Sequence, residues 1–332
     1  MLRCLAGTLS LFVIVATFDA TDAKELVVYS GRSKSLVRPI IKQFEKETGI
    51  KVNVRYGGTA QLAVALLEEG SRSPADVFWA QDAGALGALS KQGLFQKLPD
   101  SILSKVPEGF LNTAGTWIAT SGRARVLAYA PERVKPEALP NSIVDLTDPR
   151  WKGRIGWAPQ NASFQAFVTA MRVLEGESKT EEWLRGMKAN NTKSYPKNTP
   201  IIQALADGEI DLGLPNHYYL MRFKKSDSKF PVEQTSFASG DPGNLMNVAG
   251  IGILTSSRHT AAVTAFVQFL LSAKAQQFFI SEVFEYPVTD DVIPSEQLLP
   301  LDELLKLTPM LNLEDLDDLE GTLKLLRKVG IL

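Results

Sequence analysis

Two adjacent tyrosines, Tyr218 and Tyr219, have the most specific chemistry in the chain. They follow residues 209–214, an apolar run typical of a buried strand, and Asn216, a residue type favoured at helix N-caps. In the first turn of a helix, neighbouring side chains diverge by only about 100°, so both phenol oxygens can reach one point. A phenol has a pKa of about 10, and a highly charged hard cation displaces its proton. The pair predicts a hard-cation site, with ferric ion the natural candidate; simple packing at a strand–helix junction is the alternative.

Composition favours an exported protein with two lobes. The 332 residues are 45% hydrophobic, which is enough for two cores, and the formal charge of −1 gives no nucleic-acid signature. The N-terminus has Arg3, an apolar run at 9–16 and small residues up to Ala23. This pattern predicts a signal peptide at 1–23, with an uncleaved anchor as the alternative. The single cysteine, Cys4, lies inside it, so the mature chain has no disulfide and no thiolate metal site.

The elements expected to position the tyrosines form two α/β units. In the first, strands at 25–29, 50–54 and 75–79 alternate with helices at 35–48 and 59–69, and this order implies a parallel sheet. In the second, strands at 125–129, 153–157 and 209–214 alternate with helices at 161–174 and 199–208. A return strand is expected at 247–254 and helices from 301 onward. The tyrosines would then lie at the carboxyl end of a strand, where open α/β sheets bind ligands.

Seven short motifs, in order along almost the whole mature chain, carry a family resemblance. The motifs lie at residues 28–32, 57–62, 73–79, 121–126, 151–154, 196–198 and 216–219. Each motif is weak alone, and the set is specific. On these motifs the sequence resembles the periplasmic ferric-ion-binding proteins, which are substrate-binding proteins of bacterial iron-uptake ABC transporters.

The resemblance implies a type 2 periplasmic binding fold: two lobes, each a mostly parallel sheet flanked by helices, with a cleft between them. The expected N-terminal lobe is 24–123 and 249–300, and the C-terminal lobe is 124–248 and 301–332. The lobes would hinge near 121–129 and 247–254. The resemblance also implies a periplasmic protein that carries Fe(III) as transported ligand to an inner-membrane ABC permease. We expect a monomer that binds no nucleic acid.

The sequence departs from the family's ligand pattern. Ser33 and Gln81 stand where many members have a ligating His and Glu, and Phe164 stands where some have a third Tyr. Tyr218 and Tyr219 remain as metal ligands, so the resemblance implies a synergistic anion, carbonate or phosphate. Arginine forks, a helix start and neutral amides suit an oxyanion. The expected anion-binding residues are Arg32, Arg123, Asn161, Ala162, Ser163, Asn198 and Asn216. Candidate cleft-lining residues are Ser33, Gln81 and Asp82, the last being either a helix N-cap or a substitute carboxylate.

Two other functions are weighed against ferric binding. A receptor for an oxyanion or small organic anion could use the same fold, with the tyrosines only lining the cleft. A secreted hydrolase is disfavoured because the chain has no Gly-x-Ser-x-Gly elbow, no His-Glu-x-x-His pair and only two histidines. We therefore expect no enzymatic activity.

Overall fold

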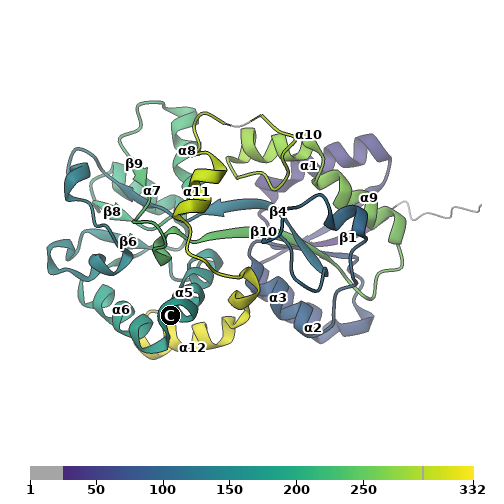
Figure 1. The fold of residues 1–332 in the computed structure, drawn as a ribbon, viewed down its shortest axis with the longest axis horizontal. Helices are drawn as coiled ribbons and strands as arrows, with labels where there is room; N and C mark the ends of the chain where they lie inside the picture. Colours follow the sequence, from purple (N-terminus) through teal and green to yellow (C-terminus); the bar gives the residue numbers. More distant parts are fainter. Residues whose placement is uncertain (1–24, 294) are drawn as a thin grey trace, which may run out of the picture.

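The computed structural model describes residues 25–293 and 295–332, and the expected signal peptide lies outside these residues. The chain forms two five-stranded sheets, each flanked by helices (Figure 1). In the part of the chain that is described, no helix combines the length and apolar character needed to cross a membrane.

The first sheet has the strand order β2-β1-β3-β10-β4. Its strands are β1 (Glu25–Ser30), β2 (Lys51–Tyr56), β3 (Val77–Ala80), β4 (Trp117–Ala124) and β10 (Met246–Ile253). The helices of this part of the chain are α1 (Lys34–Thr48), α2 (Thr59–Glu69), α3 (Ala83–Lys91), α4 (Asp100–Leu103), α9 (Thr260–Leu270) and α10 (Ala273–Phe278). Helix α1 buries Val37, Ile40, Ile41 and Phe44, which helical periodicity places on one face.

The second sheet has the order β7-β6-β8-β5-β9. Its strands are β5 (Leu127–Tyr129), β6 (Ile155–Trp157), β7 (Lys193–Ser194), β8 (Leu212–Gly213) and β9 (Glu233–Thr235). The accompanying helices are α5 (Ala162–Glu175), α6 (Glu177–Ala189), α7 (Asn198–Ala206) and α8 (His217–Ser226). Helix α7 begins at Asn198, one residue before the start at 199 that the sequence predicts.

The expected two-lobe α/β fold is confirmed, but the sheets are mixed rather than mostly parallel. In the first, β1 is parallel to β2 and β3, while β10 is antiparallel to β3 and β4. In the second, β6 is parallel to β7 and β8, while β5 is antiparallel to β8 and β9. The antiparallel pairings involve the strands on which the chain passes between the sheets: it leaves along β4 into β5 and returns from β9 into β10. The lobe boundaries given above stay predictions.

The C-terminal segment lies against both parts of the molecule. It contains α11 (Leu301–Leu307), a 3₁₀ helix η7 (Leu313–Asp317) and α12 (Leu319–Val329). Helix α12 packs on α5 and α6, while η7 contacts both α3 and α5. Figure 1 shows this segment in yellow running from beside α8 to the outer face of α5 and α6. The segment therefore bridges the two sheets.

Candidate metal site and its surroundings

The two tyrosines lie where the sequence predicts, at the start of α8 just after β8. Asn216 is the N-cap residue by its extended backbone, although its side chain caps no backbone N–H. The rings of Tyr218 and Tyr219 have centroids 4.3 Å apart and planes 31° apart. Tyr218 is buried and Tyr219 partly buried. The strand–helix junction thus directs two phenols side by side into one region.

The surroundings of Tyr219 favour its neutral phenol over the phenolate. Burial raises the pKa of Tyr219 far above its usual value, and the neighbouring Tyr218 raises it further. A hydrogen bond with Asn198 and the charge of Arg222 act in the opposite direction. A cation must therefore displace a firmly held proton before this oxygen can bind it.

Five of the expected anion-binding residues gather beside the pair. Asn161 caps α5: its Oδ1 accepts hydrogen bonds from the backbone N–H of Ser163 at 2.9 Å and from its hydroxyl at 2.7 Å. Asn198 donates to the same hydroxyl at 3.5 Å, and Ala162 is the first residue of α5. Two side-chain amide atoms are buried with no hydrogen-bond partner among the described residues: Asn198 Oδ1 and Asn216 Nδ2. Asn216 lies one residue before α8. These two amide atoms are available to a ligand.

Arg125, which was not predicted from the sequence as a site residue, lies close enough to the tyrosines to interact with them electrostatically. Its guanidinium donates to the carbonyl oxygens of Ser163 at 3.1 Å and Leu214 at 2.7 Å. Its carbon Cζ lies 4.8 Å from the centroid of the Phe167 ring. Burial lowers the pKa of Arg125 to about 9, and negative charge on the tyrosines would raise it. Arg125 therefore places a buried cation next to the phenols.

Arg32, predicted to bind the anion, has an internal carboxylate partner. Its guanidinium is buried and forks onto the carboxylate of Glu285, with Nη1–Oε1 and Nη2–Oε2 distances of 3.0 and 2.8 Å. Ser121 donates to the same carboxylate at 2.5 Å. Burial acts to raise the pKa of Glu285, but Arg32 and Arg123 outweigh it and hold that pKa below its usual range. An internal carboxylate thus takes the bidentate position that the sequence argument assigned to a bound anion.

Arg123 keeps free hydrogen-bonding capacity. Its Nη2 donates to the carbonyl oxygens of Gln81 and Val248, while Nε and Nη1 are buried without a partner in the described chain. Asp82 is the N-cap of α3 and accepts from Ala85 N at 3.2 Å. Burial raises the pKa of Asp82, and Arg123 opposes the rise.

The three candidate cleft-lining residues differ in exposure and position. Asp82 lines a space of about 10 Å³ that Ala162 of α5 lines as well, so it lies between the two sheets. Gln81 is partly buried. Ser33 is an exposed N-cap residue of α1 whose side chain caps no backbone N–H.

His217 joins the start of α8 to two other segments. Its Nδ1 accepts a hydrogen bond from Ala124 N at 3.1 Å, and Nε2 lies 2.6 Å from the carbonyl oxygen of Phe284, to which it donates in that tautomer. Burial lowers the pKa of His217 to about 4, against the two backbone hydrogen bonds. Phe284 has a left-handed φ of 61°, unusual for a bulky residue, and the next residue is Glu285. The buried histidine therefore connects the start of α8 to the end of β4 and to Phe284.

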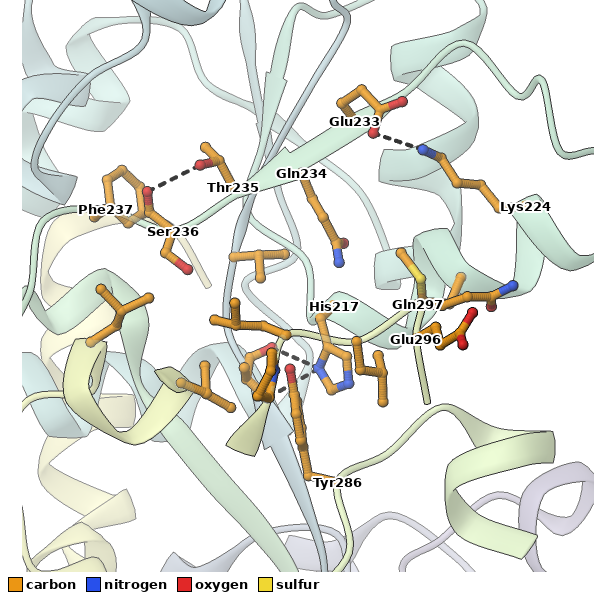
Figure 2. A pocket seen from close by; sticks show the side chains of 18 of the residues that line it. His217, Lys224, Glu233, Gln234, Thr235, Ser236, Phe237, Tyr286, Glu296 and Gln297 are labelled. Atoms are coloured by element: carbon orange, nitrogen blue, oxygen red, sulfur yellow. Dashed lines mark hydrogen bonds and ion pairs between the residues drawn. The ribbon is translucent and has the colours of Figure 1, made fainter. Parts of the chain in front are cut away.

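A cavity of about 940 Å³ lies on the other side of this connection. Figure 2 shows His217 and Tyr286 at its floor and Gln234 pointing into it. Ala124 and Val126 line it, whereas Arg123 and Arg125 alternate with them along the extended chain and point the other way. The tyrosine pair and the cavity are thus separated by one strand.

Within the part of the chain that the structure describes, carboxylates and imidazoles do not assemble a metal site of their own. In residues 25–293 and 295–332, no three His, Cys, Asp or Glu side chains gather closely enough to hold a metal ion.

The comparisons with known proteins identify the family. Residues 26–285 match the family model described as "Bacterial extracellular solute-binding protein". The chain belongs to this family. It is 34% identical over 272 residues to the "Fe(3+)-binding periplasmic protein" of Serratia marcescens, covering 81% of this chain and 80% of the relative.

Two solved structures support the same relationship for this solute-binding protein. Iron-bound HitA from Pseudomonas aeruginosa has a TM-score of 0.87 and 37% identity, covering 92% of this chain and 99% of that chain. A Trichodesmium protein (IdiA, FutA) "in complex with iron and citrate ligands" has a TM-score of 0.77 and 29% identity, with coverages of 92% and 99%. The resemblance to periplasmic ferric-ion-binding proteins is therefore confirmed.

Three residues near the site of this solute-binding protein were not predicted from the sequence. Arg125 follows Arg123 by two positions, so strand alternation could have placed both on one face. Arg222 follows the tyrosines by three and four positions, which is contact spacing on a helix. Glu285 carried no local signal, because its partner Arg32 lies 253 positions away.

Proposed function

We propose that this protein is a periplasmic receptor that binds ferric iron through the phenolates of Tyr218 and Tyr219 and delivers it to an inner-membrane ABC permease. The observation that carries the proposal is the side-by-side placement of the two rings at the start of α8. Two anionic oxygens from one helix turn suit a small, hard trivalent cation. The relatives named as ferric-binding proteins support the choice of iron.

An external anion completes the proposed site, because two phenolates supply two of the three charges that ferric ion requires. Carbonate or phosphate would be held by neutral donors at the start of α5 and α7, by Asn216, and by the partnerless nitrogens of Arg123. Arg32 is not among the proposed anion-binding residues, because its Nη1 and Nη2 already donate to the carboxylate of Glu285. The relative solved with iron and citrate supports an oxyanion partner for the metal.

Delivery follows from the two-lobe architecture. The chain crosses between the sheets from β4 into β5 and from β9 into β10, and bending at these crossings would close the lobes on the bound ion. The closed monomer would present both lobes to the permease. Export through the signal peptide at 1–23 places the protein in the periplasm.

The deciding experiment is a ferric titration of residues 24–332 in degassed, anion-depleted buffer. Bicarbonate, phosphate and citrate are then added in separate samples. We expect visible phenolate-to-iron absorption and tight binding only after an anion is added. Anion binding with no colour in any sample would favour the alternative, a receptor for an oxyanion or small organic anion.

Substitution of the tyrosines tests the ligands themselves. Tyr218→Phe and Tyr219→Phe each remove one anionic oxygen and almost no packing volume. Tyr129→Phe is the control, because Tyr129 is a buried tyrosine on β5 of the second sheet. We expect each site variant to fold and to lose most of its ferric binding while the control binds normally. Full colour in both site variants would refute the ligand assignment.

A further inference from the structure

Arg222 lies directly on the tyrosine pair. It follows Tyr219 by three residues and Tyr218 by four, so all three occupy one face of α8. Its Cζ atom is 4.9 Å from the Tyr218 ring centroid and 5.6 Å from that of Tyr219. A guanidinium within about 6 Å of an aromatic centroid is attracted by the negative face of the ring. One cation therefore contacts both proposed ligands.

The charge of Arg222 has no carboxylate partner in the described chain, unlike those of its neighbours on α8. Lys224 pairs with Glu233 at 2.7 Å, and Lys225 pairs with Glu282 at 2.8 Å. Arg222 forms no ion pair of this kind among the described residues, and its Nη2 is buried without a hydrogen-bond partner there. The neighbouring lysines thus carry surface ion pairs, whereas Arg222 is directed at the two rings.

The attraction grows when the rings become anionic. A neutral phenol offers the cation only its quadrupole, whereas a phenolate offers a full negative charge in a partly buried setting. Two phenolates and one carbonate carry four negative charges against the three of ferric ion, so the loaded site has net negative charge. A cation on the ring faces would offset part of that negative charge.

We propose that Arg222 is a positioning residue for ferric binding, which holds the two rings together and stabilises them as phenolates. The inference rests on the proposed function, because it takes Tyr218 and Tyr219 to be the iron ligands. Arg125 has a different role: its nitrogens hold the backbone carbonyls of Ser163 and Leu214, so its charge is tied to the fold. Arg222 is therefore the cation that can be changed without removing those backbone contacts.

The test compares variants by the position of the phenolate-to-iron absorption band and by ferric affinity in competition with citrate. Arg222→Met keeps the length of the side chain and removes its charge; Arg222→Lys restores a charge. Arg185→Met is the control, because Arg185 is 53% exposed and pairs with Glu181 on α6. We expect Arg222→Met to bind iron about tenfold more weakly. Its band should move to longer wavelength, since phenolates without the cation donate electrons more readily.

Arg222→Lys should recover most of the affinity and band position, and the control should match the wild type. An Arg222→Met protein with unchanged band and affinity would overturn the inference while leaving the proposed function intact. Weaker binding with an unmoved band would also overturn it, because a structural defect alone predicts that result. If Arg222→Met does not fold, Arg222→Gln is measured by the same two criteria. A colourless wild-type protein would refute the proposed function itself.

Discussion

At the scale of single residues, the most consequential contact is the ion pair of Arg32 and Glu285. Both side chains are fully buried, and the fork also involves the hydroxyl of Ser121. A buried pair of this kind adds little net stability over an apolar pair of the same size. Losing one partner, however, leaves an uncompensated buried charge. The pair therefore fixes the neighbourhood of β1, β4 and residue 285 in one arrangement.

We predict that Glu285→Ala lowers the free energy of unfolding of the metal-free protein by about 3 kcal/mol. The matched control is Glu282→Ala, since Glu282 is exposed and pairs with Lys225 at the surface. Such surface pairs contribute about 0–1 kcal/mol. Urea denaturation of both variants measures the difference. Equal losses in the two would mean that Arg32 is stabilised by other groups.

At the scale of elements, His217 makes the connection between α8, the end of β4 and Phe284 sensitive to acid. The pKa of His217 is about 4 in the folded state, against 6.5 for an unperturbed histidine. The unfolded chain therefore binds more protons between these values, so stability falls as the pH falls through that window. The neutral ring is needed because its Nδ1 accepts the Ala124 N–H.

We predict that proton binding at His217 in the unfolded chain lowers the free energy of unfolding by up to about 3 kcal/mol as the pH falls from 6.5 to 4. The His217→Gln protein should lack this pH-dependent loss of stability. The control is His259→Gln, because the side chain of His259 is 44% exposed, and this variant should retain the loss. The measurement is urea unfolding at several pH values across the window. A pH dependence that is the same in wild type and His217→Gln would contradict the assignment.

The contact of η7 with α3 depends on a glycine. A Cβ atom at Gly84 would overlap the carbonyl oxygen of Leu316, and backbone cannot move aside as a side chain can. At Gly87, on the same helix, the nearest atom would be Asp317 Cβ at 3.3 Å. We predict that Gly84→Ala costs about 1–3 kcal/mol and clearly more than Gly87→Ala. Denaturant unfolding of both variants tests the order, and the reverse order would show that η7 shifts freely on α3.

At the scale of the whole molecule, the tyrosines lie on α8, which follows β8 of the second sheet, whereas Arg123 lies on β4 of the first sheet and Asp82 follows β3 of the same sheet. A ligand that contacts both groups binds the folded, closed protein and not the unfolded chain. Such a ligand stabilises by mass action, by about 4 kcal/mol at a thousandfold excess over its Kd. Under the proposed function, iron binding would therefore hold the two halves of the fold together.

We predict that ferric salt with bicarbonate raises the Tm of the protein by several degrees, and that either component alone has a smaller effect. The double variant Tyr218→Phe/Tyr219→Phe is the control and should show no shift. Thermal unfolding scans with and without ferric salt and with and without bicarbonate measure the change in Tm. An equal shift in the double variant would show that the metal binds elsewhere.

The sequence by itself determined the features that depend on neighbours along the chain. The tyrosine pair, the cap position of Asn216 and the alternating strands and helices follow from local periodicity and turn chemistry. Tertiary structure alone decided that Glu285 takes the fork of Arg32, that Arg125 approaches the phenols and that His217 reaches Phe284. These partners are 253, about 93 and 67 positions apart. Their contacts depend on strand order, and a side chain's local pattern carries no information about which distant charge will be buried beside it.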